Sequence, residues 1–288
     1  MSKIDFSIII VSYKNLEVLV ECIDSIYKFN DIGKRLEVIV VDNSPDNKVY
    51  DYVNSNYNNV IILKNENRGF GEANNVGANI AKGEFLLFLN PDTILIEPIF
   101  KFAINTFAEN PKLTLFGVKL VNKDLEWNMS YYFIDKHDFL SGQIIRFLNK
   151  YNIFLNYNMY ISGANIFIRK LDFYKAGMFD EKIFMYYEEP DLIKRVKNLG
   201  GKIDYFKSKK IIHLEGQTVG CNEDALKRRL ESARYYSKKY NLKFINQLRS
   251  EIRYNKIKYT LYKLFNSEKK HGILETIKLL REFGEGFE

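Results

Sequence analysis

The sequence has little cysteine and no long hydrophobic run. Only Cys22 and Cys221 occur in 288 residues, and no Cys-x-x-Cys pair or cluster of cysteine with histidine is present. This scarcity argues against a disulfide scaffold and a structural zinc site, and it favours the cytoplasm. No segment reaches the ~18 apolar residues of a membrane span, and the first apolar run is too short for a signal peptide. We therefore expect a cytoplasmic protein that its own sequence does not export.

Acidic residues are scarce in the C-terminal part of the chain. Residues 227–281 hold 16 Lys and Arg against 4 Asp and Glu, a net charge of +12, whereas the whole chain carries +7. Such a tail can bind nucleic acid, bind an anionic membrane, or remain in water. No RNA- or DNA-binding motif accompanies the charge, so we expect no nucleic-acid partner and keep that function as the rival hypothesis.

Apolar runs alternate with amphipathic segments in the first part of the chain. The hydrophobic content of the whole chain, 46%, suits a folded core. The predicted strands are residues 6–11, 36–41, 60–63, 85–89 and 113–118. The predicted helices are residues 16–29, 49–57, 71–81 and 97–109, the last with Pro98 at its first position. This alternation predicts an α/β fold with a mostly parallel sheet and right-handed crossovers.

The later part of the chain is harder to interpret, and residues 122–159 receive no secondary-structure prediction. Beyond them we expect a strand at 160–169, a short helix at 171–176, a helix ending at Gly200-Gly201, and short strands at 202–206 and 210–212. From residue 223 the pattern is helical, with a break near 241–243. We therefore predict an α/β domain at 1–220 and a basic helical extension at 221–288.

Polar or acidic side chains follow several predicted strands. Pro91 cannot donate to a ladder, so it ends the buried strand 85–89 and leaves Asp92 just beyond it. Ligands of open α/β sheets lie outside the carboxyl ends of the strands, where a carboxylate suits a hard cation carrying a diphosphate. Alternatively, Asn-Pro-Asp is only a turn former. The other strand ends carry Ser12-Tyr13, Asp42, Glu188-Glu189 and His213.

Seven segments in this order carry a family resemblance: IIIVSYKN, VIVVDNSPD, NENRGFGEANNVG, FLLFLNPDT, SGANIFIRK, FDEKIFMYYEEPDLIKR and IIHLEG. Over residues 6–216 the chain resembles the family 2 inverting glycosyltransferases, within them the bacterial rhamnosyltransferases. The resemblance implies a GT-A fold, which is Rossmann-like, and a hexosyltransferase that uses a nucleoside-diphosphate sugar. It favours dTDP-rhamnose over UDP-hexoses as donor, and a bacterial surface glycan, free or lipid-linked, as acceptor.

The same resemblance assigns a nucleotide site. Ser12 and Tyr13 would line the pocket, and Asp42 would accept hydrogen bonds from the base or ribose. Arg68 would lie beside the nucleotide, and Gly69 would permit close backbone approach. Taken alone, Asp42 can equally cap a turn and Arg68 can be a solvated loop charge.

The family's Asp-x-Asp motif corresponds here to Asn90-Pro91-Asp92, so its first acid is replaced by Asn90, which we count with the nucleotide-binding residues. The resemblance implies that Asp92 binds Mn²⁺ or Mg²⁺, held mainly through the donor diphosphate. His213 matches a late histidine of the family that can complete the metal site. As a lone residue it can also be a hydrogen-bonded structural histidine.

Glu188-Glu189-Pro190-Asp191 matches the family's Glu-Asp-x-Asp, which places Glu189 at the position of the catalytic base. Direct displacement at the anomeric carbon needs a base to take the proton of the acceptor hydroxyl. The N-terminus of a helix favours the ionised carboxylate. Asp191 is the second catalytic candidate, as a support for the base or an acceptor contact. The simpler alternative is an acidic helix start.

Two further features stay open. Ser162-Gly163-Ala164 resembles the family segment that borders the acceptor site, although the glycine can equally mark a bulge. The basic, partly apolar residues 243–281 can lie peripherally on the inner face of the plasma membrane, or pack on their own domain. Because Asn90 and Glu189 depart from the family pattern, a catalytically silent relative that only binds nucleotide sugar is the alternative to an enzyme.

Overall fold

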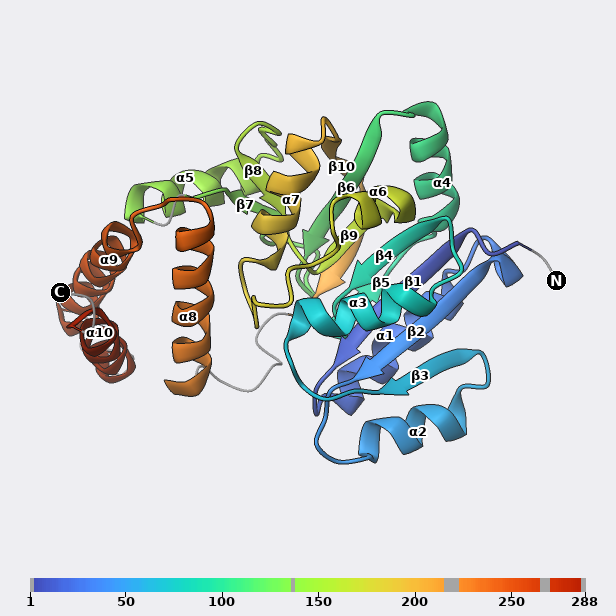
Figure 1. The fold of residues 1–288 in the computed structure, drawn as a ribbon, viewed down its shortest axis with the longest axis horizontal. Helices are drawn as coiled ribbons and strands as arrows, with labels where there is room; N and C mark the ends of the chain where they lie inside the picture. The colour runs from blue at the N-terminus through green and yellow to red at the C-terminus, as the bar shows by residue number, and fades with distance from the viewer. Residues whose placement is uncertain (1–2, 136–137, 215–222, 265–269, 286–288) are drawn as a thin grey trace.

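An eight-stranded sheet with helices on both faces forms the centre of the computed structural model, which describes residues 3–135, 138–214, 223–264 and 270–285 (Figure 1). The strand order is β3-β2-β1-β4-β9-β6-β10-β5. The bounds are β1 Phe6–Ser12, β2 Leu36–Asp42, β3 Val60–Lys64, β4 Phe85–Leu89, β5 Thr93–Leu95, β6 Leu113–Val121, β9 Asn165–Arg169 and β10 Lys202–His213.

The predicted alternation of strands and helices is confirmed at the N-terminal side, where β3, β2, β1 and β4 are parallel. Apolar side chains on one sheet face pack on α1 (Leu16–Lys28), α2 (Lys48–Asn56) and α4 (Phe100–Glu109). Those on the other face pack on α3 (Phe70–Ile80), α6 (Lys170–Lys175) and α7 (Glu188–Asn198). Because both faces are covered, β4 is buried throughout and reads as an unbroken apolar run.

The prediction of one strand over residues 160–169 is wrong. The backbone turns at Ser162-Gly163, where the N–H of Asn165 donates to the carbonyl of Ser162. The first half, β8 (Met159–Ile161), pairs with β7 (Tyr131–Phe133) in a separate two-stranded sheet. The second half, β9, lies antiparallel between β4 and β6 and makes the large sheet mixed.

Three further differences are local. Helix α4 begins at Phe100 and not at Glu97, whose carboxylate accepts a 2.9 Å hydrogen bond from the backbone N–H of Lys210. The two short strands expected at 202–206 and 210–212 form one strand, β10, with a shift in register between Phe206 and Lys210. Helix α5 (Phe139–Lys150), which the sequence pattern did not reveal, is capped by Asp138.

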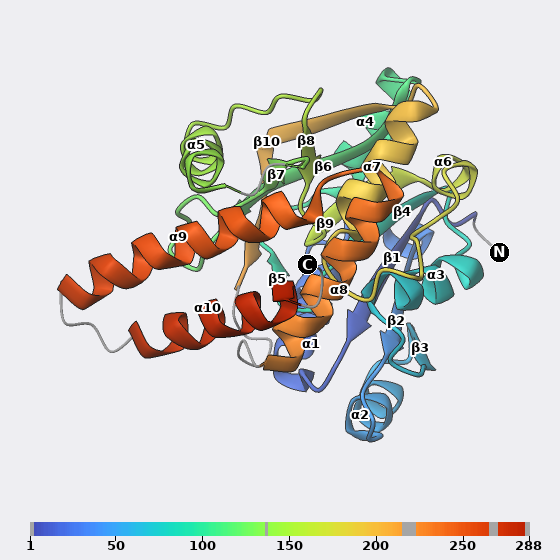
Figure 2. The same cartoon turned by 60° about the vertical axis from the view of Figure 1, so that its left-hand side comes forward.

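The C-terminal part is helical, as predicted. Helix α8 (Glu223–Lys239) packs beside the loop before α7, and α9 (Phe244–Leu264) and α10 (Lys270–Glu285) form an antiparallel pair that projects from the sheet (Figure 2). The expected domain boundary at 220/221 and Cys221 lie outside the described residues. None of the helices in the described ranges is long and apolar enough to cross a membrane.

Candidate active site

The sheet brings the predicted strand-end residues to one edge, except Glu188-Glu189, which begin helix α7 and do not follow a strand as expected. Ser12 and Asp42 are register partners at the ends of parallel β1 and β2. Strand β4, which is parallel to β1, leads into Asp92, and His213 at the end of β10 pairs with Thr93 directly after Asp92. Residues 162–164, before antiparallel β9, reach the same edge because Asn165 pairs with Leu89 at the end of β4. This edge is the candidate active site.

Asp92 and His213 lie side by side, both largely buried. The distance from Asp92 Oδ1 to His213 Nε2 is 3.4 Å, and the backbone N–H of Leu214 donates to the Asp92 carbonyl at 2.9 Å. One carboxylate oxygen and one imidazole nitrogen at this spacing fit two neighbouring ligands of one divalent ion. Within the described ranges, no group of three His, Cys, Asp or Glu side chains forms a metal cluster. An ion here would therefore take most of its ligands from a bound diphosphate or from water.

The turn after β4 is held by backbone hydrogen bonds. The N–H of Asn90 donates to the carbonyl of Ala164 at 3.2 Å, and the carbonyl of Asn90 accepts from the Thr93 N–H and, at 2.7 Å, from the Thr93 hydroxyl. The backbone positions of the turn are thus tied both to β5 and to the segment before β9. These hydrogen bonds fix the backbone on both sides of Asp92.

Glu189, at the start of α7, reaches the same segment. Its Oε1 accepts a 3.0 Å hydrogen bond from the backbone N–H of Gly163. Burial raises the pKa of the Glu189 carboxyl, and hydrogen bonds from the backbone of Glu189 itself and from Gly163 oppose that rise. The pKa of the half-buried Tyr160 phenol is raised by desolvation and, secondarily, by the charge of Glu189.

Glu188 differs from its neighbour. It is only 3% exposed, and its Oε2 has no hydrogen-bond partner among the residues that the structure describes. Burial, and secondarily the adjacent charge of Glu189, raises its pKa well above the usual value. Two adjacent carboxyl groups thus differ in environment, and the polar contact to Gly163 belongs to Glu189 alone.

Asp191 is fully buried and surrounded by donors, so the structure separates it from Glu189. One carboxylate oxygen accepts from Arg195 at 2.7 Å and 2.9 Å. The other accepts from the hydroxyl of Tyr240 at 2.8 Å and lies 2.5 Å from Lys239 Nζ. Its carboxylate therefore joins α7 to α8.

The predicted nucleotide residues occupy the ends of β1 and β2. The buried Ser12 hydroxyl donates to Asn15 Oδ1 at 2.6 Å, and Tyr13 is 41% exposed. The buried Asp42 carboxylate accepts 2.9 Å hydrogen bonds from the Ser44 N–H and from Lys64 Nζ. Sequence reasoning missed Lys64, although a basic residue at the end of the neighbouring strand was a usable signal.

Arg68 and Gly69 lie in the loop before α3. Arg68 forms an exposed ion pair with Glu66 at 2.7 Å, so the structure shows it among solvated loop charges. Gly69 has a φ of +124°, and a Cβ added there would lie 2.5 Å from the carbonyl oxygen of Phe184. The close backbone approach that we expected at Gly69 is therefore to another part of this chain.

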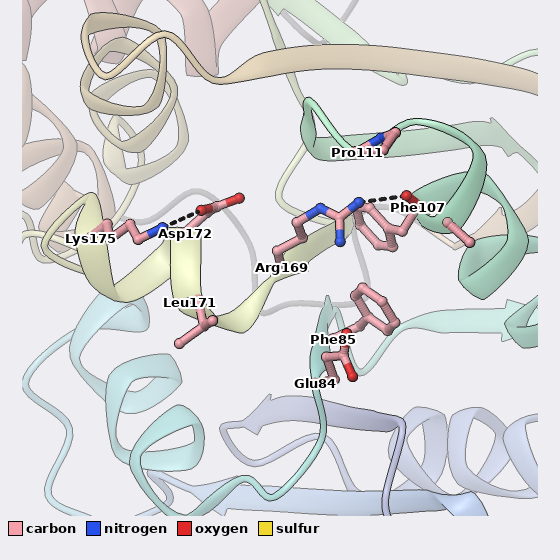
Figure 3. A pocket seen from close by; sticks show the side chains of 9 residues that line it. Glu84, Phe85, Phe107, Pro111, Arg169, Leu171, Asp172 and Lys175 are labelled. Atoms are coloured by element: carbon pink, nitrogen blue, oxygen red, sulfur yellow. Dashed lines mark hydrogen bonds and ion pairs between the residues drawn. The ribbon is translucent and has the colours of Figure 1, made fainter.

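A hollow lies at the opposite end of β4 from the candidate active site. Arg169 crosses it between Phe85 and Phe107, with its guanidinium 4.9 Å from the Phe107 ring centre (Figure 3). Arg169 donates to backbone carbonyls, and Asp172 pairs with Lys175 at 3.4 Å.

A family model described as glycosyl transferase family 2 matches residues 7–174, more than half of the chain. The chain belongs to this family. The matched range contains β1 to β9 and Asp92, and it ends before Glu189 and His213.

Curated relatives agree with this assignment. Rhamnosyltransferase WbbL of Escherichia coli (strain K12) is 24% identical over 222 residues, which cover 72% of this chain and 82% of WbbL. The minor teichoic acid biosynthesis protein GgaB of Bacillus subtilis (strain 168) is 33% identical over 110 residues, 37% of this chain and 12% of GgaB. Glycosyltransferase GlyG of Streptococcus pneumoniae is 28% identical over 46% of this chain and 44% of GlyG. The chain thus spans less than half of GgaB and GlyG.

Solved structures support the GT-A fold. Mannosyltransferase PcManGT from Pyrobaculum calidifontis, in complex with GDP-Man and Mn²⁺, superimposes with a TM-score of 0.60 at 15% identity over 84% of this chain and 65% of its own. GalNAc-T7 with UDP, GalNAc and Mn²⁺ superimposes with a TM-score of 0.58 at 16% identity, over 81% of this chain and 48% of its own. The predicted α/β GT-A fold with a helical C-terminal extension is confirmed.

Proposed function

We propose that this chain is a metal-dependent inverting glycosyltransferase that moves a sugar from a nucleoside diphosphate to a bacterial surface glycan. The observation that carries the proposal is the connection between two acids at one sheet edge. Asp92 follows the turn whose Asn90 N–H binds Ala164, and the neighbouring Gly163 N–H binds Glu189. A metal-binding carboxylate and a base carboxylate are thereby held by one short segment.

Asp92 and His213 would hold Mn²⁺ or Mg²⁺ together with the donor diphosphate, and the ion would stabilise charge on the leaving group. The solved relatives with Mn²⁺ and a nucleotide or nucleotide sugar support this choice. Asn90 cannot contribute a second charge, which fits an ion held largely by the diphosphate. Ser12, Tyr13, Asp42, Arg68 and Gly69 stay the proposed surroundings of the nucleotide.

Glu189 would take the proton of the acceptor hydroxyl. Its raised pKa brings it closer to working pH than an ordinary carboxylate, which increases its strength as a base. The hydrogen bond from Gly163 holds one carboxylate oxygen in place. We propose that Asp191 acts indirectly, because arginine, lysine and tyrosine surround its carboxylate.

Among donors we favour dTDP-rhamnose, with UDP-hexoses as the alternative. The similarity to a rhamnosyltransferase over most of both chains supports this preference. The acceptor would be a growing glycan, free or attached to a lipid carrier, and the similarity to a teichoic acid biosynthesis protein supports a surface polymer. We assign the chain as 1–220 for donor binding and catalysis and 221–288 as an extension.

We further propose that the end of α9 contacts the anionic inner face of the plasma membrane. Ile257, Leu261 and Leu264 are exposed and lie one turn apart on one helix face, with Leu264 exposed by 74%. Exposed Arg253, Lys256 and Lys263 flank this stripe. An apolar stripe beside basic residues at the end of a projecting helix pair suits the headgroup region (Figure 2).

A thermal-shift screen followed by a transfer assay tests the enzyme proposal. With Mn²⁺, dTDP or dTDP-rhamnose should raise the melting temperature more than UDP or GDP, because a ligand of the native state stabilises it by about 2.7 kcal/mol at 100 times its Kd. Incubation of dTDP-rhamnose with a lipid-linked glycan should then yield product with inverted anomeric configuration. Metal-dependent binding without any transfer would favour the silent relative, and salt-sensitive binding of DNA without nucleotide binding would favour the rival class.

A further inference from the structure

Two successive residues before Glu188 and Glu189 have a left-handed backbone. Tyr186 has a φ of +64° and Tyr187 a φ of +77°, although neither is glycine. Bulky residues avoid this region, so such a pair persists only where surrounding contacts hold it. Helix α7 begins directly after it, with the carbonyl of Tyr187 accepting from the Asp191 N–H at 3.1 Å.

The C-terminal helices supply those contacts. Tyr187 is buried against Ile183 and Ala233, and its ring centre lies 5.1 Å from that of Tyr236 on α8. Its hydroxyl accepts a hydrogen bond from the side-chain amide of Gln247 on α9. Tyr187, the residue directly before α7, is therefore held between α8 and α9, and we call it an anchor of α7.

Asp191 is a second anchor on the same side of α7. It lies four residues after Tyr187, and it is held by Lys239 of α8 and by Tyr240, which follows α8 directly. Glu189 lies two residues before Asp191, about 200° from it around the helix axis, and contacts Gly163. The extension thus contacts one side of the first turn of α7, through Tyr187 and Asp191. The side chain of Glu189, the proposed base, extends from the other side.

We infer that Tyr187 is a positioning residue, through which α8 and α9 of the C-terminal extension hold Glu189 against Gly163. The inference rests on the proposed role of Glu189 as the base. It gives the extension a part in turnover that needs no contact between the extension and donor, metal or acceptor.

Two substitutions at Tyr187 separate the ring from the backbone conformation. Glycine adopts a positive φ without strain, so Tyr187→Gly keeps the backbone shape accessible and removes the anchor. We expect its kcat to fall about 10- to 100-fold, because a misplacement of about 1 Å can cost 10²-fold, while donor KM stays within about twofold. Tyr187→Phe keeps the packing on Tyr236, so its kcat should stay within about threefold of wild type.

Tyr235→Phe is the matched control. It removes a 2.9 Å hydrogen bond from α8 to Asp180, in the loop before α7, and leaves the contacts of Tyr187 and Asp191 intact. Its kcat should equal that of wild type even if its melting temperature falls. Should Tyr187→Gly fail to fold, Tyr236→Ala removes the facing ring and should lower kcat about 10-fold.

The pH dependence of kcat distinguishes a positioning role from a purely structural one, because a loss of stability alone would not change the pH at which kcat falls. Glu189 faces Glu188, Tyr160 and the Gly163 N–H, and its pKa is raised by burial. A loosened α7 admits water, so the acidic limb of kcat should move to lower pH in Tyr187→Gly. Glu189→Gln with undiminished turnover would refute the base itself. Full turnover and an unmoved pH profile in folded Tyr187→Gly, with Glu189→Gln inactive, would overturn the positioning role alone.

Discussion

Glu189 Oε1 accepts a 3.0 Å hydrogen bond from the backbone N–H of Gly163. A Cβ added at Gly163 would lie 2.4 Å from that same oxygen, so the carboxylate occupies the space that any other residue would fill. The next residue, Ala164, accepts the hydrogen bond of Asn90. One glycine therefore links the helix that carries the proposed base to the turn that carries Asp92.

Gly163→Ala should displace the Glu189 carboxylate and lower kcat by about 10²-fold, with donor affinity little changed, because the reacting geometry is lost by about an ångström. Steady-state kinetics with separate kcat and KM will measure this. Gly142→Ala is the control, since an added Cβ there meets nothing within 4 Å and alanine favours the helix. Equal activity of both variants would contradict the proposed contact.

Glu189→Gln should lower kcat by about 10²- to 10⁴-fold, the usual contribution of a positioned base, while donor binding persists. Glu189→Asp should keep partial activity, because its carboxylate is retracted by one methylene. Asp191→Asn should reduce stability by about 1.5–3 kcal/mol, the usual contribution of a hydrogen bond to a charged group, because the buried carboxylate loses its charge toward Arg195 and Lys239; it should lower kcat less than Glu189→Gln. Inactive Asp191→Asn beside active Glu189→Gln would show that the base is Asp191.

Asp92→Asn should remove the Mn²⁺-dependent part of the thermal stabilisation by a nucleoside diphosphate, because the remaining amide binds a hard cation weakly. His213→Ala should weaken the same effect. Titrations of Mn²⁺ against melting temperature, with and without the nucleotide, measure it. Asp46→Asn, an exposed acid after β2, is the control and should behave as wild type. An undiminished metal effect in folded Asp92→Asn would place the ion elsewhere.

Glu188→Gln should change how stability depends on pH. Burial raises the folded-state pKa of Glu188 above its unfolded value, so the stability that it contributes is full below about pH 4.3 and is lost as pH rises through the folded pKa. The neutral variant avoids that loss, so it should melt at a higher temperature than wild type at pH 8 and at a similar temperature at pH 4. If the difference in melting temperature between Glu188→Gln and wild type were the same at both pH values, that result would contradict a buried, unpaired carboxyl.

Replacing Ile257, Leu261 and Leu264 by serine should weaken sedimentation with anionic vesicles at low salt. Each substitution removes an apolar side chain whose full burial would contribute about 1.5–3 kcal/mol. Leu125→Ser, at an exposed leucine in the loop after β6, is the control. Transfer to a water-soluble acceptor should be unaffected in all variants. If the wild-type protein did not sediment with anionic vesicles at low salt, the proposed membrane contact would be refuted.

Much of the fold could be predicted from local pattern. Strand β4 agrees with its predicted bounds because five successive apolar residues bounded by Gly83 and Pro91 have one stable solution, a strand covered on both faces. The helices that cover β1 to β4 lie within a few residues of their predicted bounds, because their apolar residues recur at helical spacing on one face. The family, too, was readable, because its motifs occupy strand ends whose order along the chain is preserved.

Only the tertiary structure decided how those motifs meet. The sequence pattern did not separate β8 from β9, because the turn at residues 162–164 depends on Asn165 binding the backbone of β6 across 47 positions of sequence. Nor could spacing distinguish Glu189 from Asp191, since both are acids in the first turn of one helix. Their environments differ because α8, arriving from a distant part of the chain, brings Lys239 and Tyr240 to Asp191 and leaves Glu189 facing Gly163.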